Sequence, residues 1–292
     1  SFELGMASIE ALHKMDKGSV FVDLGFGNRA AQFTYNDGVK TFIIKQLNFT
    51  YKFSDKFKVT LGSFATHVGY ELVDAVDNKN YSMSYAFTYG PFFNTGIKVQ
   101  YTSNKFSFMA GVSNPTDLKS TIDAGSTQKT FIGQLAFLGD TGSAYFNVTS
   151  GSSNTSSDEN KTQFDFVGKK KLSKAFSLGF NGTYALTTND LDSALDGEWF
   201  SLVGYVNFIV KESSSVAYRL EYLDAKQATD RLGLLTGTSV IGNTLSLNYK
   251  VGNLTIIPEF RFDIASEDIF TDSNAAPKGL TAYALLATTY SF

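Results

Sequence analysis

The sequence predicts an all-β protein, an antiparallel transmembrane β-barrel of about 16 strands, of which about 15 lie within the 292 residues. Three observations predict this fold class. Apolar and polar residues alternate along most of the chain, and the connections between the alternating segments are short and long in turn. No stretch approaches the ~20 consecutive apolar residues of a transmembrane helix. In such a barrel the short turns are periplasmic and the long loops extracellular.

The composition excludes several classes of function. The chain has 27 Phe and 15 Tyr but a single Trp, and its net charge of −3 argues against a nucleic-acid partner. It has no Cys, which excludes disulfide bonds, Cys-ligated zinc and thiol catalysis. Because only two His are present as well, we expect no metal site and no cofactor.

Residues 254–264 show the alternation most clearly. Leu254, Ile256, Phe260 and other apolar residues fall on one face, whereas Glu259 and Arg261 fall on the other. A strand of this kind presents an apolar surface to one side and a charged surface to the opposite side. Pro258 cannot donate a ladder hydrogen bond, so we expect a bulge or a local break at this position.

The number of strands has a consequence for closure of the barrel. If Phe292 ends on the side of the tight turns, counting back through alternating turns and loops places Ser1 on the side of the long loops. Bacterial barrels formed by one chain usually have an even number of strands. We therefore expect one further strand before Ser1 and treat residues 1–292 as a single transmembrane β-barrel domain.

A soluble β-sandwich or solenoid is the alternative fold. A sandwich also alternates, but Val, Ile and Leu dominate its buried face. In this chain aromatic residues gather beside the tight turns, as Tyr51, Phe53, Phe57, Tyr101 and Phe106 illustrate. Aromatic belts at the membrane interface have this arrangement, which favours the membrane barrel.

Four segments of the chain resemble known outer-membrane proteins. Leu286, Tyr290 and Phe292 share one face of the last strand, which resembles the assembly signal of bacterial outer-membrane barrels. The segments YGPFFNTGIK (89–98), EYLD (221–224) and GNLTIIPEFR (252–261) resemble the OmpL-like beta-barrel porin family of Bacteroidetes outer membranes. Asn94 stands where His is expected after Gly-Pro-Phe-Phe. The resemblance implies a barrel in the cell outer membrane with a transport role.

A barrel of about sixteen strands encloses a lumen too wide for side chains alone to fill. Alternation predicts which polar residues face it, and their mixed charges predict weak selectivity among small hydrophilic solutes. The alternative is that these residues solvate the lumen or pair across strands without forming a solute site. The predicted pore-lining residues are Lys98, Gln100, Asp165, Arg219, Glu221, Glu259, Arg261 and Asp263.

Residues 81–94 are rich in aromatic residues and are interrupted by Gly90 and Pro91. Because Pro91 forbids a continuous central ladder, we favour a segment that folds into the lumen and constricts it. Two ordinary strand ends with a bulge are the alternative. The candidates for the constriction are Tyr89, Phe92, Phe93 and Asn94.

An enzyme is the least favoured hypothesis. His67 follows Ser63 by four residues, which places them on one face of a strand but ~13 Å apart along it. A nucleophile and its base need ~2.6–3.2 Å. We therefore predict no enzymatic activity.

The favoured function is an outer-membrane channel for passive diffusion of small hydrophilic solutes. The alternative is a structural or accessory subunit of a larger outer-membrane complex, with a plugged lumen and no transport role. The expected partners are outer-membrane lipid and lipopolysaccharide, the solutes, the barrel-assembly machinery, and either other outer-membrane proteins or further copies of the chain.

Overall fold

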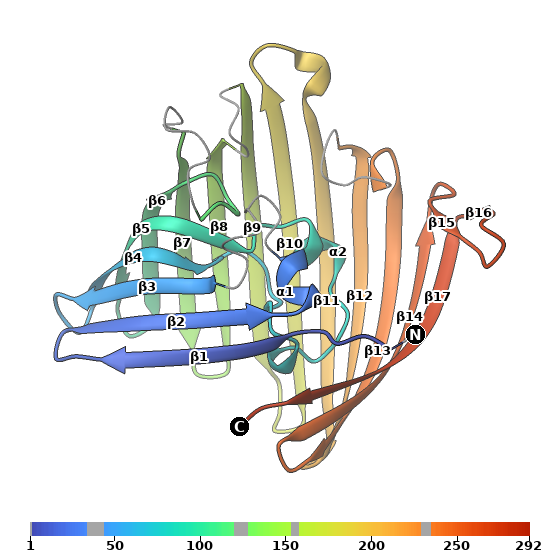
Figure 1. Cartoon of the computed structure of the whole chain (residues 1–292), viewed down its shortest axis with the longest axis horizontal. Coiled ribbons are helices and arrows are strands. Elements are labelled where there is room, and N and C mark those ends of the chain that lie inside the picture. The colour runs from blue at the N-terminus through green and yellow to red at the C-terminus, as the bar shows by residue number, and fades with distance from the viewer. Residues whose placement is uncertain (1, 34–43, 120–127, 153–157, 229–234) are drawn as a thin grey trace.

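A computed structural model describes residues 2–33, 44–119, 128–152, 158–228 and 235–292. Fifteen strands form one antiparallel sheet in which the order of strands follows the order of the chain (Figure 1). This confirms the predicted fold class, although the sheet does not close into a barrel. The elements are β1 (Ala7–Lys14), β2 (Gly18–Phe26), α1 (Asn28–Gln32), β3 (Ile44–Lys52), β4 (Phe57–Ala65), η1 (Ala75–Asp77), α2 (Tyr85–Thr88), β5 (Phe93–Thr102), β6 (Phe106–Ser113), β7 (Thr130–Gly139), β8 (Gly142–Ser152), β9 (Glu159–Lys171), β10 (Phe176–Asn189), η2 (Ser193–Leu195), β11 (Gly197–Lys211), β12 (Ser214–Gln227), β13 (Ser239–Val251), β14 (Leu254–Ala265), the short pair β15 (Phe270–Thr271) and β16 (Pro277–Lys278), and β17 (Leu280–Tyr290).

The two faces of the sheet have the polarity expected of a membrane barrel. On β14 the outward Phe260 is 51% exposed, whereas the neighbouring Glu259 and Arg261 are buried on the inner face. Exposed apolar side chains continue around the outer face, and buried polar side chains are numerous on the inner face. A soluble sandwich would have the opposite distribution, with apolar residues inside.

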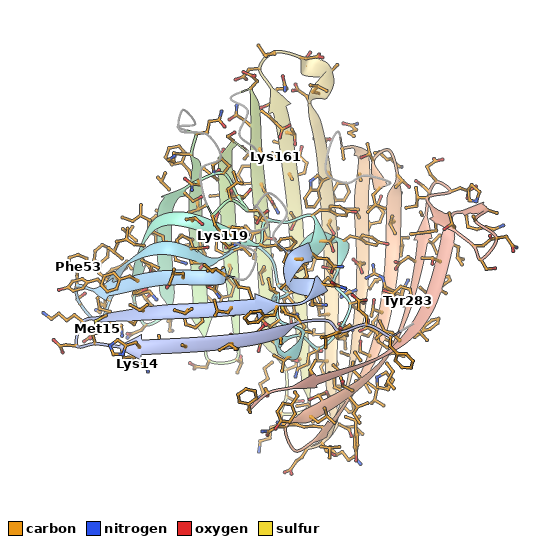
Figure 2. All side chains as sticks on the ribbon, viewed as in Figure 1. Lys14, Met15, Phe53, Lys119, Lys161 and Tyr283 are labelled. Atoms are coloured by element: carbon orange, nitrogen blue, oxygen red, sulfur yellow. The ribbon has the colours of Figure 1, made fainter. Side chains whose placement is uncertain are left out.

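Tight turns join the strands along one edge of the sheet. Lys14 ends β1, Met15 follows it, and Phe53 follows β3 at the same edge (Figure 2), where the Lys52 amide donates to the Lys17 carbonyl at 2.7 Å. The turn between β13 and β14 consists of Gly252 and Asn253, and Gly252 has φ +59°. A residue without Cβ adopts this left-handed conformation at little cost, which allows the short turn.

Pro258 interrupts the ladder without shifting its register. Ser246 pairs with Glu259 on one side of it and Tyr249 pairs with Ile256 on the other, which is the same register. On the opposite edge of β14, Pro258 pairs with Leu286 of β17. The expected break is therefore present, and the expected bulge is not part of the described pairing.

The sheet ends at β1 and β17, which lie at its two edges. Every neighbouring pair between them is antiparallel, so these two strands run in the same direction. Direct pairing of β1 with β17 would therefore be parallel, whereas one additional strand could pair with both in the antiparallel sense. The further strand expected before Ser1, the closed count of 16 and the single-domain assignment stay predictions.

Residues 66–92, which we call the inward segment, connect β4 to β5. It is longer than the ~12–15 residues of most irregular loops, and loops of such length are usually functional. The segment contains η1 and α2 and lies within the space that the curved sheet encloses (Figure 1). No helix in the described part of the chain is long and apolar enough to cross a bilayer.

Candidate functional site: an inward segment bound by buried charges

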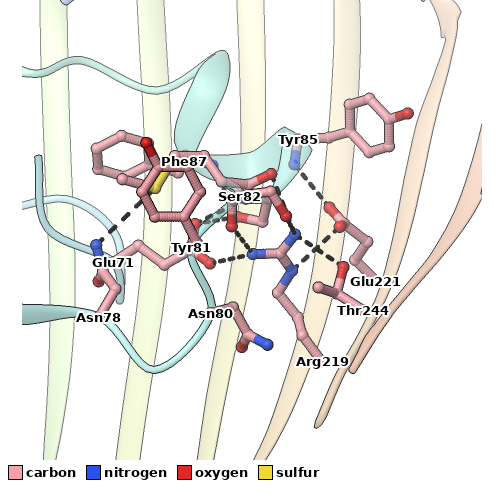
Figure 3. A network of polar contacts seen from close by, with 12 residues as sticks. Glu71, Asn78, Asn80, Tyr81, Ser82, Tyr85, Phe87, Arg219, Glu221 and Thr244 are labelled. Carbon is pink, nitrogen blue, oxygen red and sulfur yellow. Dashed lines mark hydrogen bonds and ion pairs between the residues drawn. The ribbon is translucent and has the colours of Figure 1, made fainter. Parts of the chain in front are cut away.

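Arg219 of β12 is the centre of a polar network that binds the inward segment to the sheet (Figure 3). Its side chain is 0% exposed. One terminal nitrogen, Nη1, donates to Glu71 Oε1 at 2.8 Å and to the Ser82 carbonyl at 2.5 Å. The other, Nη2, donates to the Met83 carbonyl at 3.2 Å, and Nε lies 3.2 Å from Glu221 Oε1. One guanidinium therefore binds a carboxylate and two carbonyl groups of the inward segment.

The carboxylates of the sheet bind the backbone of the same segment. Glu259 accepts hydrogen bonds from the Tyr81 and Ser82 amides at 2.7 and 2.9 Å. Glu221, which is 1% exposed, accepts one from the Tyr85 amide at 2.6 Å. Buried backbone groups outside regular structure need such partners. The inward charges of β12 and β14 therefore satisfy backbone groups that strand pairing does not.

Arg261 of β14 extends the network. Its Nη1 donates to the Met83 carbonyl at 2.7 Å, and its Nη2 lies 3.1 Å from Glu221 Oε1. Its Nε donates to Asp263 at 2.8 Å, and the same carboxylate accepts a hydrogen bond from the Tyr85 hydroxyl at 2.8 Å. Burial raises the pKa of the Tyr85 phenol, so this hydroxyl stays protonated as a donor.

A glycine on β13 makes room for these carboxylates. Gly242 pairs with Glu221 on one side and with Asp263 on the other. A Cβ at this position would lie 2.7 Å from the Glu221 Cγ and 2.9 Å from Asp263 Oδ1. The missing side chain lets both carboxylates lean over β13 toward the inward segment.

The middle of the inward segment is held by β1 to β3. Lys45 Nζ lies 2.5 Å from Asp74 Oδ2 and 2.9 Å from Asp23 Oδ1, and the Ser8 hydroxyl donates to Asp74 at 2.6 Å. The carboxylates of Glu10, Asp23 and Asp74 approach one another within 4.8 Å, which is a spacing that could hold a cation. The Lys45 ammonium already supplies a cation there, so we assign no metal site to these residues.

Strands β8 and β9 provide a third set of contacts. The Gly69 amide donates to Asp165 Oδ1 at 3.0 Å, and His67 Nε2 lies 2.9 Å from the Val148 carbonyl. Desolvation lowers the pKa of His67 to about 4, so its imidazole is neutral at neutral pH. The inward segment thus contacts three separate parts of the wall.

The constriction candidates lie at the end of the inward segment and at the start of β5. Phe92 and Phe93 are buried in an apolar cluster with Phe87, and both of their amides donate to Asp117 Oδ1, at 2.7 and 3.2 Å. Asp117 adopts φ +63°, an uncommon conformation for a residue with a side chain. Tyr89 ends α2, so residues 85–88 are helical instead of extended.

Asn94 is buried on β5, where its Oδ1 accepts a hydrogen bond from the Ser113 hydroxyl at 3.4 Å. Strand pairing of β5 begins only at Phe93. The structure therefore folds the stretch before it inward, as the favoured interpretation predicts. The role of these residues in constricting a pore stays a prediction.

The predicted pore-lining residues fall into two groups. Lys98 and Gln100 on β5 are partly exposed, with Lys98 Nζ 3.9 Å from the centre of the Phe64 ring. The other six are buried, and each takes part in the hydrogen bonds and ion pairs that surround or hold the inward segment; these are Asp165, Arg219, Glu221, Glu259, Arg261 and Asp263. That any of them lines a water-filled pore stays a prediction.

The residues of the expected assembly signal point outward. Leu286 and Tyr290 of β17 are strongly exposed, and Phe292 follows the end of that strand. The Tyr290 and Phe292 rings lie 6.2 Å apart. Their position on the outer face near the chain end is compatible with recognition from outside, which also stays a prediction.

Sequence reasoning did not identify the partners on the inward segment. It assigned no role to Glu71 or Asp74, but both bind cations of the sheet. It also missed Lys45 and Asp117. The signal in the sequence is that three acidic residues, Glu71, Asp74 and Asp77, precede the aromatic stretch in an unusually long connection.

Comparisons with known proteins agree with this architecture. The family model described as "Putative beta-barrel porin-2, OmpL-like" matches residues 1–292. OmpT of Vibrio cholerae, expressed in the outer membrane, has a similar fold, with a TM-score of 0.62 and 11% identity, over 98% of this chain and 89% of that chain. The outer membrane channel DcaP of Acinetobacter baumannii has a TM-score of 0.60 and 13% identity, over 98% and 84% of the two chains. A porin refined at 1.8 Å has a TM-score of 0.56 and 13% identity, over 98% and 92%. No curated protein matches the chain.

Proposed function

Because the chain belongs to the OmpL-like beta-barrel porin family, we propose that it is a channel for passive diffusion of small hydrophilic solutes past the inward segment. The protein is located in the outer membrane as a multi-stranded β-barrel protein of the porin class. Its outer face contacts membrane lipid, and its inner face is polar. The inward segment, bound by side chains of β1, β3, β9, β12, β13 and β14, is the single observation that supports this proposal, because such a segment narrows the lumen without relying on the long loops.

The charges around the inward segment also bear on selectivity. The two arginines pair with carboxylates of the wall and of the segment, and their side chains are buried. Ion selectivity arises from rings of one charge sign that face the permeating ion. Paired and buried charges contribute little field of this kind, so we expect weak selectivity between small cations and anions.

Single-channel recording tests the proposal. The folded protein, inserted in a planar lipid bilayer, should give stepwise currents of similar size in potassium chloride and in salts with larger organic ions of either sign. Protein that is folded, as judged by its electrophoretic mobility with and without heating, but gives no current steps would contradict the channel. A strong preference for one sign of ion would contradict the predicted weak selectivity.

A second candidate function is an accessory subunit whose lumen is plugged. The observation that favours it is the burial of Arg219, Glu221 and Glu259. These side chains contact the inward segment and are almost inaccessible to solvent. This candidate predicts no current and stoichiometric co-purification with other envelope proteins. The same co-purification tests for assembly partners. These include the barrel-assembly machinery, which we expect to recognise Leu286, Tyr290 and Phe292. Neither candidate function is enzymatic. Any hydrolytic activity of the wild type should therefore be at background level, and His67→Ala should not change it.

A further inference from the structure

A small recess lies between the end of α2 and the inner face of β7 to β11. Tyr89, Gly90 and Pro91 form one side of it, and wall residues including Thr187 and Trp199 form the other. The recess encloses about 50 Å³, which is room for a few water molecules at ~10–15 Å³ each. It is therefore large enough for a ligand of a few non-hydrogen atoms, and its open side admits part of a larger one.

The wall of the recess is rich in hydroxyl groups. Thr130 and Thr149 are buried there, on the inner faces of β7 and β8, and Thr187 of β10 is buried beside them. Among the described residues that line the recess, Lys161 alone is charged, and its Nζ lies 3.8 Å from Glu159 Oε1. A hydroxyl both donates and accepts hydrogen bonds. The lining thus suits an uncharged ligand with donors and acceptors better than an ion.

Gln163 of β9 supplies an unpaired amide to this recess. Its side chain is 8% exposed, and its Nε2 has no hydrogen-bond partner among the described residues. A Cβ on Gly90 would lie 3.9 Å from Nε2, so the amide faces the glycine side of the recess. A buried donor without an acceptor is costly. A ligand that offers an oxygen at this point removes that cost.

Two aromatic residues border the hydroxyl groups. Trp199 is the only tryptophan of the chain, and it lines the recess together with Tyr89. Aromatic rings offer apolar faces beside a polar edge. Carbon-bound hydrogens of a polyol pack against such faces, while its hydroxyl groups exchange hydrogen bonds with threonine and glutamine side chains.

We propose that this recess is a binding site for neutral polyhydroxylated solutes, with glycerol as a ligand of matching size and one edge of a monosaccharide as the larger case. The ligand hydroxyls pair with Gln163 and the threonines, and its carbon skeleton packs beside Trp199. If polyols bind here, they are a class of solute that the channel transports, and this part of the inference rests on the proposed function. The binding itself does not depend on conduction.

The fluorescence of Trp199 measures binding without any current. Titration of the folded protein in detergent with glycerol, and separately with glucose, should change the emission of this single tryptophan in a saturable way. Gln163→Leu should weaken the binding about tenfold or more, as expected for loss of one hydrogen bond to a buried group. Thr187→Val keeps the side-chain volume and should weaken it severalfold. Gln32→Leu is the matched control, because Gln32 is an exposed residue of α1 that does not line the recess, and it should leave the affinity unchanged.

The outcomes separate the two proposals. Saturable emission changes without current steps in a bilayer would refute the channel and leave the site standing. Current steps that neither polyol alters, together with no saturable emission change, would overturn the site and leave the channel standing. Saturation by acetate or phosphate in place of polyols would assign an anion site to the Lys161 side and would also overturn the proposal. Equal affinities for wild type and Gln163→Leu would do the same.

Discussion

Strands β12 and β1 belong to one sheet but differ in what their inner faces contact. On β12, alternate side chains are buried, and Arg219 and Glu221 bind the inward segment. On β1, nearly every side chain is exposed, and Ser8 alone of its residues has a described side-chain hydrogen bond to that segment. The same alternating pattern forms both strands. The difference teaches that contacts with the inward segment, beyond strand pairing, decide which inner-face side chains of the wall are buried.

The largest test of this comparison is Arg219→Met. Removing one member of a buried ion network leaves other charges unpaired, which costs about 3–5 kcal/mol; here Glu71 loses its cation and Glu221 keeps only Arg261. In this variant we expect the inward segment to detach from the wall. Residues 66–92 should then become more sensitive to protease, and single-channel currents should increase because the segment no longer narrows the lumen. Lys250→Met on the neighbouring strand β13 is the control, because Lys250 is exposed. Unchanged protease protection in Arg219→Met would show that the network does not hold the segment.

A matched pair of leucines compares the two strands directly. Leu223 of β12 is 0% exposed within an apolar cluster, whereas Leu12 of β1 is 54% exposed. Leu223→Ala should lower the free energy of unfolding by about 2–5 kcal/mol, and Leu12→Ala by less than about 0.5 kcal/mol. Urea unfolding in lipid vesicles measures both. A comparable loss in Leu12→Ala would mean that β1 is covered in the intact protein, and the contrast between the strands would fail.

The outer face offers a test that does not depend on the inward segment. Phe260 points outward from β14, opposite in direction to Arg261. Phe260→Arg should cost about 2–4 kcal/mol if the residue lies near the middle of the bilayer, and should reduce the folded fraction in vesicles. Phe53→Arg, at a tight turn near the interface, should cost at most about 1 kcal/mol. The reverse order of the two effects would show that the faces have been assigned wrongly.

The smallest predicted effect concerns pH. His67 of the inward segment has its pKa lowered to about 4 by burial, with Lys98 also lowering it and Asp165 opposing, whereas the unfolded value is about 6.5. His67 therefore does not change the free energy of unfolding above pH 6.5. As the pH falls from 6.5 toward 4, the unfolded state binds the proton first, and the free energy of unfolding decreases, by about 2 kcal/mol at pH 5.

Protease sensitivity of the inward segment, measured between pH 7 and pH 5, should rise in the wild type. The rise should be smaller in His67→Gln, which cannot be protonated in this range. Carboxylates titrate in both proteins, so the difference between them isolates the histidine. Identical pH profiles would remove His67 from the list of groups that hold the segment.

Much of the fold could be predicted from residue order alone. The alternation over 254–264 determines which side chains of β14 face lipid and which face inward, because a strand has a period of two. The lengths of the connections determine which edge of the sheet carries the short turns and which carries the long loops. The outward position of Leu286 and Tyr290 follows from the two-residue period of the strand. The inward course of residues 81–92 was predictable from Pro91, which cannot continue a ladder.

The partners of the inward charges could not be predicted in this way. Glu71 and Arg219 are 148 positions apart in the chain, and Glu259 and Tyr81 are 178 apart. A two-residue period places Arg219 and Glu259 on the inner face but contains no information on what occupies the space before them. The sequence by itself determined the polarity of each face, since that depends on neighbours along one strand. Only the tertiary structure decided that these charges bind a buried backbone segment, because the segment and the wall meet through the curvature of the whole sheet.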